Sequence, residues 1–230
     1  MKISVIIPVL NEEENIKACI ASLHNNSAGF LCEIIIVDGG STDQTIAVCE
    51  DLGCQVLHSS IKSRATQMNL GASIAKGEVL YFVHADIRVF PGFDVEILNS
   101  LNRKVHAGCF RYQFDSDKIM LKINSWFTRF NGALAGGGDQ SLFIKKRIYD
   151  RLGGFDERYC IMEDFDFTRR IKKKYKFIVV PKALKVSARK YEKNSWAKVQ
   201  LVNLYMIILF RKDTEPAKIK HLYAKLLNYR

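Results

Sequence analysis

Acidic residues end several apolar segments of the chain, and their positions suit a site for a metal-bound nucleotide diphosphate that faces a general base. Glu163 and Asp164 lie together in the stretch GGFDERYCIMEDFDFTRRIKKK. Upstream, Asp38 follows the apolar run IIIV, and Asp86 ends the run VLYFVHAD. The carboxyl ends of parallel strands meet at one edge of a sheet, where ligands of α/β proteins bind. We therefore expect these carboxylates to line one site.

Two side chains at the end of the most hydrophobic expected strand could bind a metal ion. His84 and Asp86 are two positions apart, so they would share one face of that strand. Imidazole and carboxylate groups can hold Mn²⁺ or Mg²⁺ while phosphate oxygens complete the coordination shell. An aspartate at a strand end can also be a turn residue, and this alternative applies equally to Asp38, which precedes Gly39-Gly40.

The acids Glu163, Asp164 and Asp166 also have a purely structural interpretation. They stand at the beginning of an expected helix, where the helix dipole favours negative charge. We expect one of the three to serve only the helix, and the sequence leaves open which one.

The elements that would position these residues alternate between strand and helix in the first 86 residues. Short β-branched runs predict buried strands at 2–9, 33–37, 54–57 and 78–83. Helices are expected between them: one capped by Asn11, one capped by Ser41 or Thr42, and one over 64–75. This alternation is typical of a parallel, doubly wound sheet.

The rest of the chain has weaker patterns. Strands are expected at 107–114, 140–144 and 177–180, the last closed by Pro181, and helices at 94–101, 148–152 and 164–175. Residues 119–135 are aromatic without clear periodicity, 136–138 form a flexible glycine stretch, and the remainder is expected to be helical. We expect the apolar segment 199–210 to pack in a core, with a position on a membrane surface as the alternative.

Length and composition indicate a cytoplasmic protein with one substantial core. The chain has 230 residues, of which 48% are hydrophobic and 26% are charged, as in ordinary soluble proteins. Its apolar runs fall short of the roughly 20 residues that span a bilayer. The N-terminal run VIIPVL is too short for a signal peptide and is broken by Pro8. The six cysteines include no C-x-x-C pair, which suits reduced thiols.

The positive charge is concentrated near the C-terminal end. Of the net charge of +11, residues 1–167 contribute −4 and residues 168–230 contribute +15. Such asymmetry points to an anionic partner: nucleic acid, phospholipid or a phosphorylated substrate. Because the chain has no aromatic-basic RNA signature and no helix-turn-helix pattern, we expect no nucleic-acid binding. A lipid-linked or phosphorylated acceptor, or a peripheral contact with the inner face of a membrane, would account for the basic region.

Four segments, in their order along the chain, resemble glycosyltransferase family 2 with the GT-A fold. These segments are SVIIPVLNEEENI, IIIVDGGSTDQT, SRATQMNLGASIAKGEVLYFVHAD and GGFDE…MEDFDFTRRI, and the resemblance covers at least residues 1–175. Within the family, the chain is most similar to a small stand-alone subgroup often called arsenosugar-biosynthesis-type glycosyltransferases. In that subgroup HAD replaces the usual D-x-D, and its Ser-Ala-Arg-Arg-like element reads SARKY at residues 187–191 here.

The resemblance implies a fold, a domain organisation and a reaction. A Rossmann-like, mostly parallel central sheet with helices on both faces would occupy residues 1–185. A basic, mainly helical extension over residues 186–230 would pack on or beside it. The enzyme would be an inverting transferase of the hexosyltransferase type, using a nucleotide-diphosphate sugar. A UDP-sugar is the expected donor, and Mn²⁺ or Mg²⁺ the expected cofactor.

The resemblance also implies roles for individual residues. The nucleotide-binding positions would be Pro8, Leu10, Glu12, Asp38, Arg64, Ala85 and Asp86. Asp164 would be the general base, with Glu163 beside it in the catalytic pair. Asp139, Gln140 and Arg189 would line the sugar and acceptor pocket.

The metal site departs from the usual family pattern. Asp86 would reach the metal ion, but His84 stands where most of the family has aspartate. This leaves one fewer negative charge at the metal. Imidazole can still ligate Mn²⁺, or it can hydrogen-bond to phosphate instead.

Two other functions fit parts of the pattern. A sugar nucleotidyltransferase would need a loop rich in glycine and arginine after the first strand, where the chain has VLNEE at residues 9–13. The non-enzymatic alternative is a degenerate fold that serves as a membrane-surface or scaffold module. The intact Asp38, Asp86 and Asp164 argue against that alternative, whereas His84 leaves it open.

Overall fold

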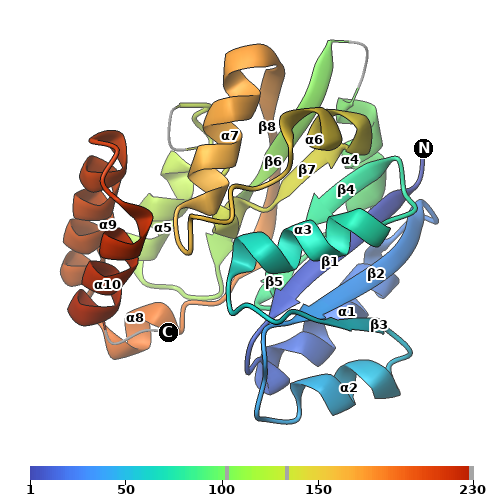
Figure 1. Cartoon of the computed structure of the whole chain (residues 1–230), viewed down its shortest axis with the longest axis horizontal. Helices are drawn as coiled ribbons and strands as arrows, with labels where there is room; N and C mark the ends of the chain where they lie inside the picture. The colour runs from blue at the N-terminus through green and yellow to red at the C-terminus, as the bar shows by residue number, and fades with distance from the viewer. Residues whose placement is uncertain (102–103, 133–134, 228–230) are drawn as a thin grey trace.

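The computed structural model describes residues 1–101, 104–132 and 135–227, and within them eight strands form one mixed sheet (Figure 1). The strand order is β3-β2-β1-β4-β7-β6-β8-β5. The strands are β1 (Ile3–Val9), β2 (Leu31–Asp38), β3 (Gln55–His58), β4 (Val79–Phe82), β5 (Ile87–Arg88), β6 (Val105–Phe114), β7 (Leu142–Lys145) and β8 (Lys176–Val186). The first four are parallel neighbours, as the sequence predicts. In the second half, β7 runs antiparallel to β4 and β6, while β6 and β8 are parallel.

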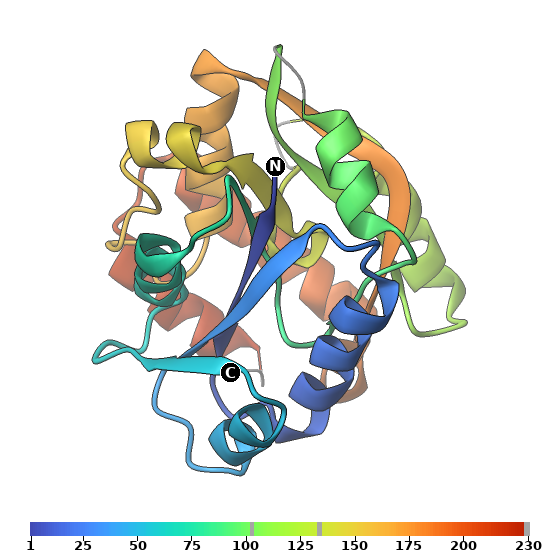
Figure 2. The same cartoon turned by 90° about the vertical axis from the view of Figure 1, so that its right-hand side faces the viewer.

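Helices cover both faces of the sheet because its central strands are apolar on both faces (Figures 1 and 2). They are α1 (Glu13–Asn26), α2 (Thr45–Asp51), α3 (Arg64–Ile74), α4 (Phe93–Ser100), α5 (Ile119–Phe127), α6 (Lys146–Leu152), α7 (Glu163–Lys174), α8 (Lys190–Lys193), α9 (Trp196–Arg211) and α10 (Pro216–Leu226). A strand buried on both sides has apolar residues at successive positions. In β1, Ile3, Val5 and Ile7 join the core under α1 and α4, whereas Ile6 joins the core under α3, α6 and α7.

The C-terminal helices have a separate apolar cluster. α9 and α10 lie side by side at the left of Figure 1, beyond the end of β8 at Val186. Their cluster is made by Val199, Val202, Met206, Phe210, Ile219 and Leu227. Partly buried residues of the segment before α7, including Tyr159 and Ile161, pack against it, so these helices support the start of α7. Among the described residues, no helix is long and apolar enough to cross a membrane.

Pro181 does not close the last strand, contrary to the sequence prediction. β8 continues through it to Val186, and the register with β6 shifts between Phe110 and Arg111, where the partners are Val180 and Ala183. Proline lacks the N–H that a regular ladder needs, but an irregularity in the pairing tolerates it.

The predicted caps of the first two helices were also wrong. α1 begins at Glu13, and Asn11 has a left-handed φ of 52° instead of a capping conformation. The Asn11 side-chain oxygen accepts a hydrogen bond from the Thr42 backbone N–H at 2.8 Å, and the Asn11 backbone N–H donates to Ser41 Oγ at 2.9 Å. Asn11 and Ser41 each form a hydrogen bond with the loop that contains the other residue, so neither caps the helix that follows it.

Residues 119–127 form the helix α5, which was not predicted from the sequence. Most of its large apolar side chains face outward, and Leu121 is buried. The expected flexible stretch at 136–138 runs into a short 3₁₀ turn over Gly138–Gln140. The two-residue strand β5 was not predicted, since Ile87 and Arg88 are too few to form a pattern.

Candidate active site

The ends of β1 and β2 lie side by side, and a buried glutamine ties them together. Val9 of β1 pairs with Asp38 of β2. The Gln67 amide nitrogen donates to the carbonyl oxygens of Val9 at 2.9 Å and Val37 at 2.6 Å. This residue was not predicted from the sequence, although a polar side chain among the buried apolar residues of α3 is a detectable signal.

Asp38 organises the loop that follows β2. Its buried carboxylate accepts hydrogen bonds from the backbone N–H groups of Gly40 at 2.8 Å and Ser41 at 3.1 Å. The imidazole Nδ1 of His58 lies 3.8 Å from the same carboxylate. This is the geometry of a turn aspartate at the predicted nucleotide edge.

Glu12 and Arg189 join the two ends of the chain at the site. Arg189 Nη2 donates to Glu12 Oε1 at 2.6 Å, and the two side chains are 25% and 14% exposed. The Glu12 backbone N–H also donates to Thr45 Oγ1 at 2.8 Å. One residue predicted for the nucleotide and one predicted for the acceptor therefore form a single partly buried ion pair.

His84 and Asp86 follow β4 and are both half-buried. Burial lowers the pKa of His84 to about 3, and the nearby charge of Arg64 acts in the same direction. The imidazole is therefore neutral at physiological pH and can accept a hydrogen bond or ligate a metal. Burial raises the pKa of Asp86 to about 6, with a further contribution from Asp139 that Arg189 opposes.

Glu163 and Asp164 are buried at the first turn of α7. Burial raises the pKa of both carboxyl groups, and the neighbouring charge of Glu163 raises the pKa of Asp164 further, whereas Arg64 lowers both. Within the described part of the chain, Glu163 Oε2 has no hydrogen-bond partner although it is buried. The residue before the pair, Met162, has a left-handed φ of 67°. Unpaired buried groups and such backbone strain concentrate at functional sites.

Asp166 is the acid of this trio that serves the structure. It is buried and accepts hydrogen bonds from Arg170 Nε at 2.7 Å and Arg169 Nη2 at 3.1 Å. Arg170 also donates to the carbonyl oxygens of Leu152 and Gly154. Asp166 therefore orients Arg170, which in turn binds the carbonyl groups at the end of α6 and in the loop before α7.

Gly138 brings the metal-side histidine and the acid pair together. A Cβ atom placed on Gly138 would lie 2.3 Å from His84 Cε1 and 2.9 Å from Asp164 Oδ2. Both side chains therefore flank this glycine, and no larger residue fits between them. The preceding Gly137 makes a similar close approach to Phe165.

The two pocket residues predicted after the glycines differ in their surroundings. Asp139 is exposed, and its charge contributes to the raised pKa values of Asp86 and Asp164, so it lies near both groups. Gln140 is buried: its Oε1 accepts from the Gly136 N–H at 2.7 Å, and its Nε2 donates to the Thr128 carbonyl at 3.1 Å. Its side chain therefore holds the glycine loop in place.

The remaining predicted residues surround the same edge. Pro8 and Ala85 are buried, and Leu10 is half-buried beside the end of β1. Arg64 is the exposed first residue of α3, and its charge lowers the pKa values of His84, Glu163 and Asp164. The edge thus combines a cationic side chain with carboxylates from both halves of the chain.

A metal ion at this site would need ligands beyond the protein. Among the described residues, no group of three or more His, Cys, Asp and Glu side chains is arranged to hold a metal. His84 and Asp86 offer one neutral nitrogen and one carboxylate, which suit Mn²⁺ or Mg²⁺ if phosphate oxygens and water complete the shell. The donor set fits an ion that is shared with a diphosphate.

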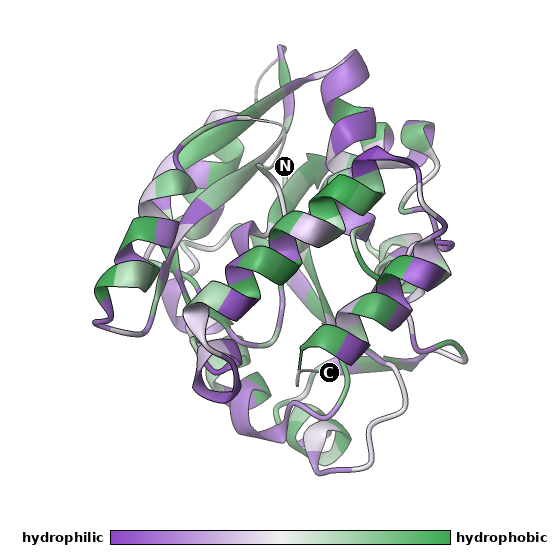
Figure 3. Cartoon of the chain, turned by 90° about the vertical axis from the view of Figure 1, so that its left-hand side faces the viewer, coloured by the Kyte–Doolittle hydropathy of each residue, from purple (hydrophilic) through white to green (hydrophobic). Residues whose placement is uncertain are grey.

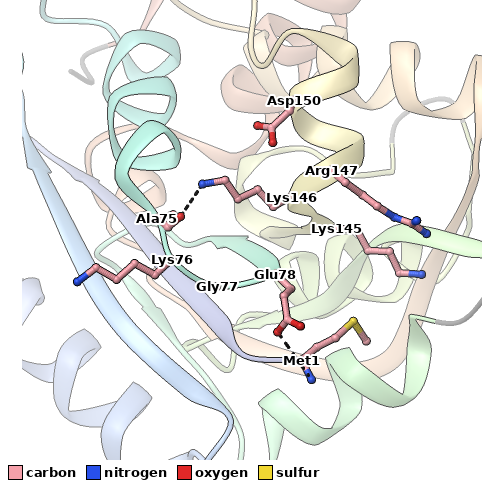
Figure 4. A pocket seen from close by; sticks show the side chains of 9 residues that line it. All are labelled: Met1, Ala75, Lys76, Gly77, Glu78, Lys145, Lys146, Arg147 and Asp150. Atoms are coloured by element: carbon pink, nitrogen blue, oxygen red, sulfur yellow. Dashed lines mark hydrogen bonds and ion pairs between the residues drawn. The ribbon is translucent and has the colours of Figure 1, made fainter.

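A basic cavity lies at the opposite edge of the sheet, where β1 and β4 begin (Figure 4). The described residues that line it are Met1, Ala75, Lys76, Gly77, Glu78, Lys145, Lys146, Arg147 and Asp150. None of the predicted site residues is among them. Lys146 Nζ donates to the Ala75 carbonyl, which satisfies the end of α3. We therefore expect the chemistry at the carboxylate edge and not in this cavity.

Comparison with known proteins identifies related sequences. The sequence profile of glycosyl transferase family 2 matches residues 4–163. A PGL/p-HBAD biosynthesis glycosyltransferase of Mycobacterium tuberculosis is 27% identical over 194 residues, which cover 73% of this chain and 68% of that protein.

Two solved structures share the fold. The mannosyltransferase PcManGT of Pyrobaculum calidifontis, in complex with GDP-Man and Mn²⁺, is similar with a TM-score of 0.70 at 19% identity, over 98% of this chain and 69% of its own. The TarS 1–349 structure of S. aureus in complex with UDP has a TM-score of 0.65 at 18% identity, over 99% of this chain and 71% of its own. At these identities the likeness shows the fold alone.

Proposed function

The chain belongs to glycosyl transferase family 2 and has the GT-A fold, and we propose that it is an inverting enzyme with Asp164 as its general base. The family transfers a sugar from a nucleotide sugar; in this proposal the donor is a UDP-sugar and the acceptor group is a hydroxyl. The observation that carries the proposal is the buried pair of Glu163 and Asp164, of which Asp164 lies with His84 against Gly138.

The proposed chemical step is a single displacement. The acceptor oxygen forms a bond to the anomeric carbon as the bond from that carbon to the diphosphate oxygen breaks. Asp164 takes the proton of the acceptor hydroxyl, and the leaving diphosphate keeps the electron pair. Base catalysis of this kind typically contributes about 10²- to 10⁴-fold. Glu163 lies beside the base, and its charge makes Asp164 a stronger proton acceptor.

The nucleotide would lie along the ends of β1, β2 and β4. Its base and ribose would lie near Pro8, Leu10, Glu12 and Asp38, and its phosphates near Arg64, Ala85 and Asp86. The guanidinium of Arg64 is close enough to lower the pKa values of both acids at 163 and 164. The same charge would stabilise the negative charge that develops on the leaving diphosphate.

A divalent ion would complete the donor site. Asp86 and His84 would hold Mn²⁺ or Mg²⁺ together with the diphosphate. When bound, the ion neutralises charge on the leaving group. The neutral imidazole of His84 keeps its lone pair available for the ion, and its N–H can donate to a phosphate oxygen.

The acceptor would approach from the side of the glycine loop. Asp139 would contact sugar or acceptor hydroxyls, while Gln140 and Arg189 would position the loop and the wall of the pocket. The net charge of +15 on residues 168–230 favours a phosphorylated or lipid-linked acceptor.

Thermal shift with a nucleotide panel tests the donor side of this proposal. We expect one nucleoside diphosphate of UDP, GDP, CDP, dTDP and ADP to raise the melting temperature when Mn²⁺ is present, because a ligand of the native state stabilises it by mass action. Asp86→Ala should remove that shift. Asp150→Ala, an acid at the opposite edge of the sheet, is the matched control and should keep it. No shift with any nucleotide, or a full shift in Asp86→Ala, would contradict the proposed donor site.

A further inference from the structure

A row of large apolar side chains lies on the outer side of α5 and the turn after it. The row consists of Ile119, Ile123, Trp126, Phe127 and Phe130, which are between 43% and 68% exposed. The ring centroid of Trp126 lies 5.2 Å from those of both Phe127 and Phe130, so the three rings form one cluster. A surface helix normally turns its apolar stripe towards the core, and large exposed apolar patches mark interaction sites.

α9 carries a second such row. Its inner side packs in the cluster with α10, while its outer row consists of Leu201, Leu204, Tyr205 and Ile208, between 42% and 68% exposed. Figure 3 shows hydrophobic residues along the side of α9 that faces the viewer. A helix that is apolar on opposite sides is expected to be covered on both.

A hollow lies between the beginning of α5 and the beginning of α9. It is lined by Lys118, Ile119, Met120, Leu121, Tyr191, Ser195 and Trp196. Beside it, Trp196 Nε1 donates to Asn124 Oδ1 at 3.3 Å, and Asn124 Nδ2 donates to Tyr191 Oη at 3.2 Å. α5 is therefore in contact with the start of α9, and we term the row on α5 together with this hollow the outer face.

We propose that the outer face docks on an anionic lipid bilayer, with the α5 rings at the level of the lipid headgroups. Exposed cations surround both rows: Lys118, Lys122, Arg129, Lys193, Lys198, Arg211 and Lys212. The exposed acids nearby in the sequence are fewer: Asp115, Asp117, Glu192, Asp213 and Glu215. Helices that lie in a membrane interface typically have Trp and Phe on one side, with Lys and Arg beside them.

The placement of charge favours a bilayer over a second copy of the chain. The guanidinium of Arg129 lies 4.5 Å from the centre of the Trp126 ring, so a cation would sit beside the inserted ring, where lipid phosphates are found. In a symmetric dimer the same cationic patch would pack against itself, which brings like charges together. An anionic headgroup layer would instead attract all of them.

The outer face adjoins the acceptor side of the site. Tyr191, which lines the hollow, stands two residues after Arg189, whose guanidinium donates to Glu12 Oε1 at 2.6 Å in the site. A bilayer-embedded acceptor would therefore arrive on the side of the site where Arg189 lies. That consequence rests on the proposed function, whereas docking itself does not.

Vesicle flotation tests the docking. We expect the unmodified chain to float with vesicles of phosphatidylcholine and phosphatidylglycerol, and much less with phosphatidylcholine alone. The triple variant Trp126→Ser, Phe127→Ser, Phe130→Ser should bind the anionic vesicles at least about tenfold more weakly, because it loses three apolar side chains at the interface. Leu52→Ser with Ile61→Ser, also exposed but in the nucleotide half, is the matched control and should bind unchanged.

Tryptophan fluorescence is a second readout. The chain has two tryptophans, so Trp196→Phe leaves Trp126 as the only reporter, and its emission should shift to shorter wavelength with anionic vesicles. Equal binding of the triple and unmodified chains, or no blue shift, would overturn the proposal. So would a concentration-dependent dimer, seen by ultracentrifugation, that the triple variant abolishes. Neither readout uses sugar transfer, so failure here leaves the proposed function standing.

Discussion

At the scale of single residues, three neighbouring acids of the site differ in their hydrogen-bond partners. Asp166 accepts hydrogen bonds from Arg169 and Arg170, whereas Glu163 and Asp164 are buried and Glu163 Oε2 has no hydrogen-bond partner among the described residues. Burying a carboxyl group without a full set of partners makes its charged form costly. The protein keeps that arrangement at the position where we propose that a proton is taken up.

The pH dependence of turnover should report this pair. A base must be unprotonated, so kcat/KM should fall as the pH drops through the apparent pKa of the pair, which lies above the 3.8 of an ordinary aspartate. Glu163→Gln removes the charge that raises the pKa of Asp164. In this variant the fall of kcat/KM on the acid side of the profile, its acid limb, should therefore move to lower pH. An acid limb that does not move in Glu163→Gln would contradict the coupling of the two groups.

Gly138 should be intolerant of even a methyl group. In Gly138→Ala the new Cβ would meet His84 and Asp164 at less than van der Waals distance, so the two side chains must separate. We expect the rate of sugar transfer to fall about 100-fold, because small misplacements of reacting groups have effects of this size. The nucleoside diphosphate formed per unit time measures this rate.

Gly132→Ala is the matched control for this substitution. It lies nearby in the chain, and a Cβ there would meet no atom of residues 1–101, 104–132 and 135–227 within 4 Å. Its turnover should stay near that of the unmodified chain. If Gly138→Ala is as active as Gly132→Ala, the close approach has no role in catalysis.

At the scale of elements, α3 positions the site because it packs unusually close to the sheet. A Cβ on Gly71 would lie 2.6 Å from Ile6 Cγ2 and 3.1 Å from Val37 Cγ2. This contact sets the distance of α3 from β1 and β2, and hence the positions of Arg64 and Gln67 on the same helix.

Gly71→Ala should therefore destabilise the fold although alanine is the better helix former. Overpacking a core typically costs about 1–3 kcal/mol, which exceeds the gain of roughly 0.5–1 kcal/mol in helix propensity. Urea unfolding should show a lower midpoint. Ser73→Ala on the exposed side of the same helix should change stability by less than about 0.5 kcal/mol. A Gly71→Ala chain at least as stable as the unmodified one would show that α3 can move away from the sheet.

The elements differ in how far the sequence could predict them. The first four strands and three helices followed from local patterns, because each strand is a short β-branched run that ends at a polar residue. α5 was not predicted, because Met120 and Leu121 stand among the apolar residues of its outer row and obscure their helical spacing. Pro181 misled the prediction of β8 because a pairing irregularity, which depends on the neighbouring strand, absorbs it.

At the scale of the whole molecule, the site joins two halves of the chain. Residues up to Asp86 would hold the nucleotide, and residues from Gly138 to Arg189 would supply the base and the acceptor side. The ion pair of Arg189 and Glu12 connects these halves across 177 positions of sequence. The resemblance to the family implied a role for both residues. A local sequence pattern cannot show that two residues so far apart in the chain are in contact. The contact of Gly138 with His84 is unpredictable for the same reason.

The most direct test of the account separates nucleotide binding from turnover in Asp164→Asn. We expect this variant to bind the nucleoside diphosphate as the unmodified chain does, and to lose about 10²- to 10⁴-fold in product formation from the nucleotide sugar. Asp166→Asn, the same substitution two residues away, is the matched control: it should melt at a lower temperature but still turn over below that temperature. Normal turnover in Asp164→Asn would contradict the assignment of Asp164 as the general base.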